Sequence, residues 1–185
     1  MKKLIAAACL TLAAFGASAE RADSLKQAVI NFDSLDVDEV TQTRILTGNV
    51  VLTRGTLLLK SDRALVKETP EGYMSVTLTS APGKIATFRQ KQDGGPDRWI
   101  EGQAERIEYD ERAELVKLFS NAEVRESENK RMTNEIKGPF ISYDARKEVA
   151  QVRNDASGAS KAGGGRGTLI IAPRRTTPAT EGAKQ

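Results

Sequence analysis

A short segment of this chain occurs twice with nearly the same residues. Residues 107–115 read IEYDERAEL and residues 141–149 read ISYDARKEV, 34 positions further along the chain. A third, more divergent copy precedes them at an offset of 72, so that Asn49 corresponds to Asn121. Internal similarity of this kind is typical of stacked or rolled architectures, because one small unit cannot bury its own apolar face.

The residues inside the repeat favour strands over helices. A spacing of about 34 residues also suits helical tetratricopeptide arrays. However, the repeat is rich in β-branched and aromatic residues, and its apolar residues recur two apart, as in residues 115–118 (LVKL). Alternation with a period of two is typical of a half-buried strand. The repeat therefore predicts a β-hairpin.

Short apolar runs separated by turn signals continue from about residue 29 to residue 172. Residues 70–72 (PEG) predict a turn, because proline presets φ and glycine accepts positive φ, and residues 93–97 (DGGPD) are the clearest hairpin tip. Gly48 and Asn49 form either a bulge or a turn. Strands spaced roughly 8–12 residues apart, without helical windows, indicate an all-β sandwich or barrel-like roll of about a dozen to sixteen strands.

The repeat also predicts which side chains face inward, because side chains of a strand alternate between its two faces. Corresponding apolar positions keep one parity within each strand, while charged residues occupy the other parity. One face of a long sheet is therefore expected to be apolar and the other polar. The corresponding apolar positions are Leu35/Ile107/Ile141, Val37/Tyr109/Tyr143, Leu46/Leu118/Val152, Val50/Ala122 and Leu52/Val124.

Residues 1–19 read as a cleaved secretory signal peptide. Two lysines precede an apolar run at residues 4–15, which is too short to span a bilayer, and residues 17–19 (ASA) form a small-x-small cleavage site. A buried N-terminal helix is the weaker alternative because of this triplet. The single cysteine, Cys9, lies inside the apolar run, so we expect an exported, soluble product without disulfides that relies on its core and its β-ladders.

The rest of the chain divides into one folded domain and a polar end. Residues 20–173 are expected to form a single domain, which includes a glycine-rich flexible loop at 154–167 and a last strand at 168–172. Pro173 ends that strand, and residues 174–185 are polar and expected to be disordered.

The composition argues against several classes of chemistry. The chain has no histidine and no cysteine beyond Cys9, which excludes Ser-His-Asp and Cys-His nucleophiles and imidazole or thiolate metal ligation. Glu105, Glu108 and Asp110 could supply paired carboxylates for glycoside hydrolysis, but they fall among the charged positions and are better explained as solvated charges. Asp110 and its counterpart Asp144 lie where the chain is about to turn, which favours a turn-making role. We expect no catalytic residue, metal or cofactor.

The charge balance argues against nucleic acid as a partner. The chain carries 28 lysines and arginines and 25 acidic residues; without Lys2 and Lys3, 26 basic residues remain against 25 acidic ones, a net charge of +1. Binding driven by counterion release needs a basic stripe. Here the charges alternate in sign along the strands, which is typical of a solvated face.

Several segments resemble the LptA (OstA) family of periplasmic lipopolysaccharide-transport proteins. The motifs that carry the resemblance are residues 46–56 (LTGNVVLTRGT), 83–94 (GKIATFRQKQDG), 101–104 (EGQA) and 136–143 (IKGPFISY). The resemblance extends from about residue 30 to residue 173. The chain departs from the family pattern at residues 120–122 (SNA), in place of the usual Gly-Asn, and in its longer glycine-rich loop.

The resemblance implies an antiparallel β-jellyroll, rolled into an open, twisted groove that holds the acyl chains of lipid A. It also implies a periplasmic protein that bridges the inner and outer membranes, with an LptC-like inner-membrane partner and an LptD-like outer-membrane partner. Ten side chains are expected to contact the acyl chains; the Ile/Tyr pairs and Phe88 carry the most weight because family match and repeat parity agree there. These residues are Phe32, Leu46, Val50, Leu52, Phe88, Ile107, Tyr109, Leu118, Ile141 and Tyr143.

An open roll leaves two unpaired edges, and exposed N–H and C=O rows favour strand addition. The expected edges are the first strand, with Val29, Ile30 and Asn31, and the last strand, with Thr168, Leu169, Ile170 and Ile171. Joining a first edge to a last edge is heterologous, so it predicts head-to-tail self-association that need not close. The alternative is that Pro173 and the polar tail block the last edge and leave a monomer.

Two other functions remain open at this stage. A structural periplasmic β-scaffold could join membrane proteins through its edge strands without carrying lipid. An exported carboxylate hydrolase is the third and weakest candidate.

Overall fold

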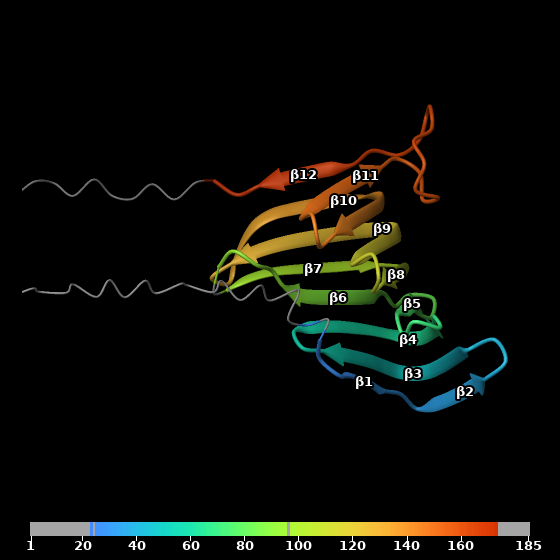
Figure 1. The fold of residues 1–185 in the computed structure, drawn as a ribbon. Helices are drawn as coiled ribbons and strands as arrows, with labels where there is room; N and C mark the ends of the chain where they lie inside the picture. Colours follow the sequence, from blue (N-terminus) through green and yellow to red (C-terminus); the bar gives the residue numbers. More distant parts are fainter. Residues whose placement is uncertain (1–22, 24, 96, 174–185) are drawn as a thin grey trace, which may run out of the picture.

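The computed structural model describes residues 23, 25–95 and 97–173, and their fold is all-β (Figure 1). The predicted signal peptide and the polar tail from residue 174 lie outside the described residues. Within these residues, twelve strands join into one sheet in which every pairing is antiparallel. The strands are β1 (Ala28–Asn31), β2 (Ser34–Asp38), β3 (Thr43–Arg54), β4 (Leu57–Glu68), β5 (Met74–Thr79), β6 (Ala86–Lys91), β7 (Arg98–Ala104), β8 (Arg106–Asp110), β9 (Leu115–Glu128), β10 (Arg131–Asp144), β11 (Val149–Arg153) and β12 (Thr168–Ile171).

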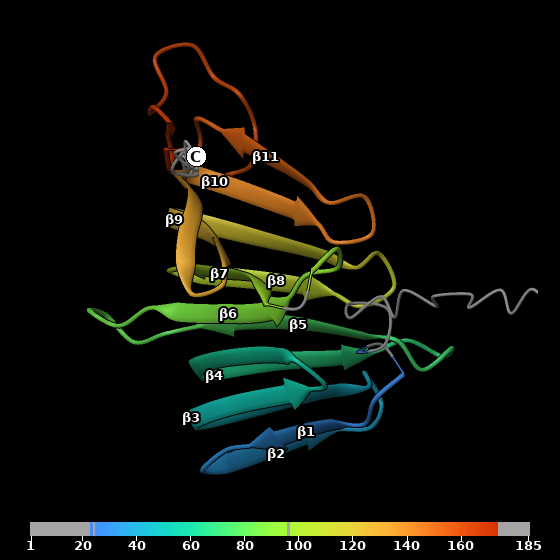
Figure 2. The same ribbon diagram turned by 90° about the vertical axis from the view of Figure 1, so that its left-hand side faces the viewer.

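Four long strands divide the sheet into two layers. β3 and β4 have 12 residues each and β9 and β10 have 14 each, and one half of each strand belongs to each layer. The first layer has the order β1-β3-β4-β6-β7-β9-β10-β12. The second has the order β2-β3-β4-β5-β8-β9-β10-β11. Figures 1 and 2 show the strands stacked from β1 and β2 at one end to β11 and β12 at the other, and the predicted antiparallel roll is confirmed.

The long strands bend from one layer to the other at irregular positions. In β3, Gly48 and Asn49 have φ angles of 79° and 47°, and the register with β4 shifts between Thr47 and Val50. Of the two alternatives for Gly48 and Asn49, a bulge or a turn, the structure shows the bulge. A bulge increases the local bend and twist of a strand. In β9, Ser120 and Asn121 take the same left-handed conformation, with φ angles of 60° and 52°.

The offset of 72 relates these two bends residue by residue. Asp33, between β1 and β2, accepts a hydrogen bond from Asn49 Nδ2 at 2.9 Å. Glu105, between β7 and β8, accepts a hydrogen bond from Asn121 Nδ2 at 2.6 Å. In both bends the asparagine tolerates the left-handed backbone. Its side chain also hydrogen-bonds to the adjacent segment of the protein, at the point where that segment passes from one layer to the other. The repeat found in the sequence is thus a repeated corner.

Each copy of the repeat is a hairpin in the same register, as predicted. Leu35 faces Leu46 in β2–β3, Ile107 faces Leu118 in β8–β9, and Ile141 faces Val152 in β10–β11. The predicted turn-making role of the aspartates is also confirmed. Asp110 Oδ1 accepts the Ala113 N–H at 2.9 Å, and Asp144 Oδ1 accepts the Lys147 N–H at 3.0 Å. These bonds fix the chain in the turn that reverses its direction.

The apolar parity of the strands faces the space between the layers and forms one core cluster, which confirms the predicted apolar and polar faces. β2 is the exception to the predicted burial: Leu35 and Val37 are 41 % and 47 % exposed, whereas their counterparts Ile107 and Tyr109 are buried. β2 lies at the end of its layer, so it has a strand on one side only and its inward side chains are incompletely covered.

The glycine-rich segment 154–167 contains no strand, as predicted. Asn154 nevertheless holds it in a defined path. Its Nδ2 donates to the Lys161 carbonyl at 2.7 Å, and its Oδ1 accepts the Lys161 N–H at 2.8 Å. Gly158 packs over the Phe140 ring, with an ideal Cβ position 3.2 Å from the ring atoms. The loop therefore covers an aromatic side chain on the outer side of the second layer.

Candidate functional site

The space between the two layers brings together nine of the ten side chains predicted to contact lipid. All nine belong to one apolar cluster and are at most 9 % exposed. They come from five strands, β3, β6, β8, β9 and β10, and from both layers. The nine are Leu46, Val50, Leu52, Phe88, Ile107, Tyr109, Leu118, Ile141 and Tyr143.

Phe32 is the one predicted residue outside this cluster. It lies between β1 and β2, and 38 % of its surface is exposed. The reason is its position at the end of the sheet, where both neighbouring strands pair only with β3. Phe32 therefore belongs to the exposed end of the molecule, and its expected place in the interior is corrected.

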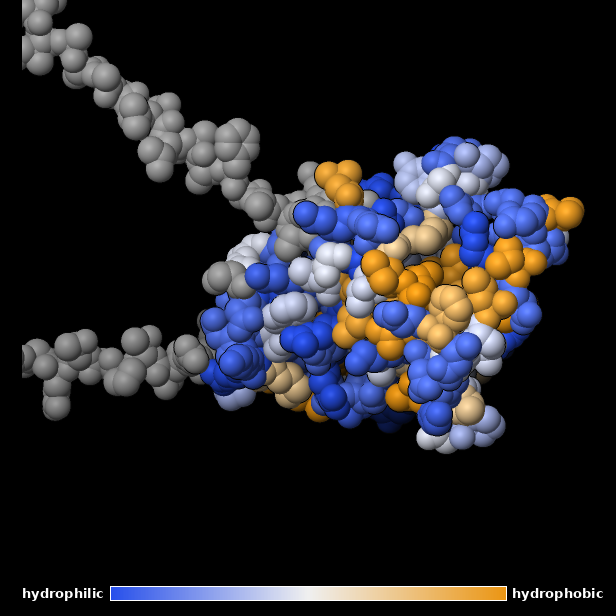
Figure 3. Space-filling view, turned by 90° about the horizontal axis from the view of Figure 1, so that it is seen from below, coloured by the Kyte–Doolittle hydropathy of each residue, from blue (hydrophilic) through white to orange (hydrophobic). Residues whose placement is uncertain are grey.

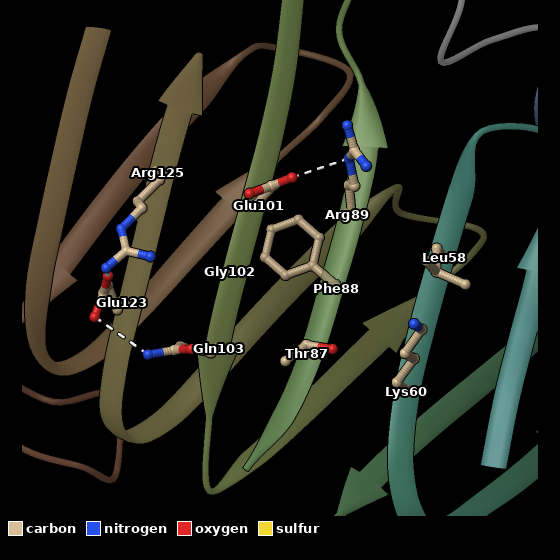
Figure 4. Close-up of a pocket in the computed structure, with 10 residues that line it drawn as sticks. All are labelled: Leu58, Lys60, Thr87, Phe88, Arg89, Glu101, Gly102, Gln103, Glu123 and Arg125. Atoms are coloured by element: carbon tan, nitrogen blue, oxygen red, sulfur yellow. Dashed lines mark hydrogen bonds and ion pairs between the residues drawn. The ribbon is translucent and has the colours of Figure 1, made fainter. Parts of the chain in front are cut away.

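The buried Phe88 ring occupies space that a side chain on Gly102, its cross-strand partner, would otherwise fill. In β6–β7 it pairs with Gly102, and an ideal Cβ on Gly102 would lie 2.2 Å from Phe88 Cε1 and 3.0 Å from Leu118 Cδ2. Figure 4 shows the Phe88 ring between the two strands, beside Gly102. Sequence reasoning included Gly102 in a family motif but did not find this packing role; its position within a strand was the available signal, since glycine there often marks a close approach.

The two inward tyrosines place phenol groups within the apolar cluster. Burial raises the pKa of Tyr109 to about 12, and the nearby Glu111 carboxylate adds to this effect. Tyr143 accepts a hydrogen bond from Gln92 Nε2 at 3.2 Å. The Tyr109 phenol is therefore neutral at physiological pH, and the predicted lipid-contacting side chains include no acidic or basic residue.

The outer face of the first layer is polar and its charges pair with one another. A shallow hollow of about 280 Å³, drawn in Figure 4, is lined by Arg89, Glu101, Glu123 and Arg125 among others. Arg89 Nε lies 2.9 Å from Glu101 Oε1, and Arg125 Nε lies 3.0 Å from Glu135 Oε1. The hydrogen bond from Arg125 is the main reason that the pKa of Glu135 falls to about 2. This ladder of ion pairs forms the polar outer face that the alternating charges predicted, and within it the Glu135 side chain is buried.

The carboxylates considered for hydrolysis have structural partners. Glu105 accepts a hydrogen bond from Asn121 at the β9 corner, and Asp110 accepts one in the β8–β9 turn. Glu108 Oε1 lies 3.6 Å from Arg106 Nη1 on the outer face. Among the described residues there is no group of three or more side chains suited to hold a metal ion. In the same part of the chain, no helix is long and apolar enough to cross a membrane.

The two ends of the sheet expose most of the large apolar side chains that remain outside the core. At one end, β1 and β2 both pair only with β3; at the other, β11 and β12 both pair only with β10. Figure 3 shows the apolar surface seen from the β1–β2 end. The exposed apolar side chains at the first end are Leu25, Val29, Phe32, Leu35, Val37 and Val40, and those at the second are Val149, Leu169, Ile170 and Ile171.

The structure thus shows the two expected edge strands, β1 and β12, at the ends of the sheet. It adds a second edge strand at each end, β2 beside β1 and β11 beside β12. β1 contains Val29, Ile30 and Asn31, and β12 ends at Ile171, one residue before the predicted limit. β2 and β11 were missed as edges, because sequence patterns do not reveal that a long strand has different neighbours along its two halves. Each end therefore presents two short strands.

A match to a family model shows to which known proteins this chain is related. The model, described as "LptA/(LptD N-terminal domain) LPS transport protein", matches residues 29–149. The chain belongs to this family. Membership confirms the resemblance that the sequence motifs indicated, and the matched residues run from β1 to the start of β11.

Two bacterial relatives in the family match most of the chain. The lipopolysaccharide export system protein LptA of Haemophilus influenzae is 28 % identical over 159 residues, which cover 86 % of this chain and 87 % of that protein. LptA of Escherichia coli K12 is 29 % identical over 170 residues, which cover 92 % of this chain and 84 % of that protein. Both alignments cover more than four fifths of this chain and of the relative.

A solved structure of the family has the same fold. The crystal structure of LptH from Pseudomonas aeruginosa, described as the LptA-homologous periplasmic component of the lipopolysaccharide transport device, superposes with a TM-score of 0.70. The match covers 82 % of this chain and 99 % of that chain at 23 % sequence identity. The predicted antiparallel architecture is thus confirmed by an LptA-type fold.

Proposed function

We propose that this protein binds lipopolysaccharide and carries it through the periplasm toward the outer membrane, with the acyl chains shielded between its two layers. The observation that carries the proposal is the single apolar cluster, built from one face of both layers in a chain that belongs to a lipopolysaccharide-transport family. The nine interior side chains, with Phe32 at the exposed end, are the proposed lipid contacts.

The energetics of lipid in water explain why such a carrier is needed. Burial of a methylene contributes about 0.8 kcal/mol, so one acyl chain of about a dozen carbons costs roughly 10 kcal/mol in water. An apolar interior offsets this cost without making or breaking a bond. Transport of this kind needs no catalytic residue or cofactor, and the paired outer carboxylates are consistent with that.

The two ends of the sheet support a proposal about partners. Residues 28–39 contain four acidic residues and no basic one, whereas residues 149–171 contain Arg153, Lys161 and Arg166 against one acidic residue, Asp155. Apolar edge strands of opposite charge suit head-to-tail pairing of copies of this chain, because complementary charges steer and orient association. We assign an LptC-like inner-membrane protein and an LptD-like outer-membrane protein to the two ends of such a bridge.

Crosslinking in cells tests the lipid contact. A photoreactive residue at Phe88 or Tyr109 is expected to form a lipopolysaccharide adduct, whereas one at Glu108, on the outer face of the same strand as Tyr109, is not. Equal labelling at all three positions would refute the inward assignment. Absence of any adduct, with partner binding intact, would favour the scaffold that joins membrane proteins without carrying lipid.

A proline in the last strand tests the edge. Ile170→Pro, or deletion of residues 168–185, is expected to abolish concentration-dependent light scattering and capture of an LptD-like partner, because proline disrupts a strand ladder. Ser160→Pro, in the glycine-rich loop outside any strand, is the matched control. Undiminished self-association and capture in both edge variants would show that the last edge is not the docking surface.

A further inference from the structure

One side of the two-layered fold is closed by side chains. On the opposite side, β3, β4, β9 and β10 pass continuously from layer to layer. The side closed by side chains carries the hairpin turns of both layers. These turns include residues 55–56 of the first layer and residues 111–114 of the second. We call the line where these turns meet the seam. Any separation of the layers must begin there, because the other side is covalently continuous.

The buried polar residues of the protein concentrate at the seam. Five polar or charged residues are buried among the described residues, and four of them belong to the seam. The fifth, Glu135, belongs to the ion pairs of the outer face. The four seam residues are Asp23, Gln90, Gln92 and Glu111.

Among the described residues, an ion pair and a hydrogen bond join side chains of the two layers across the seam. Arg54, at the end of β3 in the first layer, forms an ion pair with Glu111 in the β8–β9 turn of the second, and both side chains are largely buried. Glu111 is held in place because its Oε2 also accepts the Met74 N–H at 2.8 Å. Further along, Gln92 after β6 donates to the Tyr143 hydroxyl of β10 at 3.2 Å.

The segment before β1 reinforces the first-layer side of the seam. Arg54 Nε donates to the Lys26 carbonyl at 2.9 Å. Asp23 accepts hydrogen bonds from the Thr56 N–H at 2.8 Å and from Gln90 Nε2 at 3.3 Å. The position of Arg54 is thus fixed from both sides, by this segment and by Glu111.

The interior behind the seam has no room for an acyl chain in the closed state. Phe88, Ile107 and Leu118 are at most 2 % exposed, and the missing side chain of Gly102 is replaced by the Phe88 ring. The hollow drawn in Figure 4 extends over the polar outer face and is lined mostly by charged and polar side chains. Lipid can therefore reach the interior only if the layers move apart.

We propose that the seam is the passage through which acyl chains enter, and that the Arg54–Glu111 and Gln92–Tyr143 contacts form a latch that must release first. The proposal rests on the proposed function. Polar side chains suit this role because, on opening, their hydrogen bonds are exchanged for bonds to water at a small net cost, whereas an apolar seam would expose apolar surface. The phosphorylated saccharide headgroup stays in water outside the seam.

A crosslink across the latch is the direct test. The sequence has no cysteine other than Cys9 in the predicted signal peptide, so Arg54→Cys/Glu111→Cys introduces two thiols into an otherwise cysteine-free mature chain. Joining them with a short, reducible bis-maleimide is expected to suppress uptake of fluorescent lipid A, and cleavage of the linker is expected to restore it. Uptake by the linked protein at the rate of the cleaved protein would overturn the proposal.

Charge reversal tests the latch in the opposite direction. Arg54→Glu places two carboxylates together and is expected to accelerate uptake severalfold, and Arg54→Glu/Glu111→Arg is expected to return it toward the original rate. Arg89→Glu is the matched control, because its partner Glu101 lies on the half-exposed outer face. Unchanged uptake in folded Arg54→Glu protein would refute the latch, whereas absence of lipid binding in every variant and in the original protein would refute the proposed function itself.

Discussion

Replacement of Gly102 by alanine tests whether the interior is as closely packed as the geometry indicates. The added methyl would lie 2.2 Å from Phe88 Cε1 and 2.8 Å from Phe88 Cδ1, well inside contact distance. Leu118 Cδ2, 3.0 Å away, limits the escape of the ring. Phe88 must therefore leave its position or push the two layers apart.

The expected cost follows from two opposing effects. Overpacking a well-packed core typically costs about 1–3 kcal/mol. Replacing glycine by alanine also restricts the unfolded chain, which returns about 0.4–1 kcal/mol. The Gly102 φ angle is not positive, so alanine adds no backbone strain. We expect net destabilisation of about 1–2 kcal/mol, or a fall in Tm of roughly 2–8 °C for a domain of this size.

Urea unfolding followed by the fluorescence of Trp99, the one tryptophan of the sequence, measures this effect. The compensating variant is Gly102→Ala/Phe88→Leu, in which the smaller side chain relieves the clash. The two substitutions should therefore be coupled, with the double variant more stable than the sum of the single effects predicts. Additive effects, or an unchanged midpoint for Gly102→Ala, would refute the close packing of Phe88 on Gly102.

Three further predictions concern the corner, the outer face and the absence of catalysis. Asn121→Gly keeps access to the left-handed backbone but loses the hydrogen bond to Glu105, so chemical unfolding should show a free energy of unfolding lower by about 1 kcal/mol. Asn121→Val should lower the free energy of unfolding by roughly 1–3 kcal/mol more, because valine is strained in this backbone conformation. The pKa of Glu135 is lowered to about 2, chiefly by Arg125, so its stabilising contribution is present above about pH 4.5 and is lost as the pH falls through about 2. The Tm difference between the original protein and Glu135→Gln should shrink over that range, and a difference that grows on acidification would contradict the assignment. Glu108→Ala should leave lipopolysaccharide delivery unchanged in cells, and loss of delivery by the folded variant would require a specific polar role.

Much of the interior could be predicted because its determinants are local. Alternation along each strand placed Ile107, Tyr109 and Leu118 on the inward face, and the side-chain parity of a strand does not depend on distant contacts. Comparison of the repeated segments then extended the same assignment to Ile141 and Tyr143. The prediction from alternation was wrong for Phe32, which keeps the inward parity of β1 but is not covered by a neighbouring strand.

The edges show a second limit of pattern reasoning. β2 and β11 carry the same repeat as the buried β8–β9 hairpin, so their sequences do not mark them as terminal. Their exposure depends on which strands pair with each half of β3 and β10, and that is a property of the complete sheet. The pairing also places two short strands at each end instead of one.

The strands, the hairpin register, the turn aspartates and the apolar face follow from the sequence alone, because each depends on residues close together in the chain. The packing of Phe88 against Gly102 and the contact of Arg54 with Glu111, 57 residues away, depend instead on the complete fold. Such contacts depend on the angle at which four long strands bend between the layers. That angle results from bulges and packing acting together over the whole sheet, so no local pattern encodes which side chains meet across the seam.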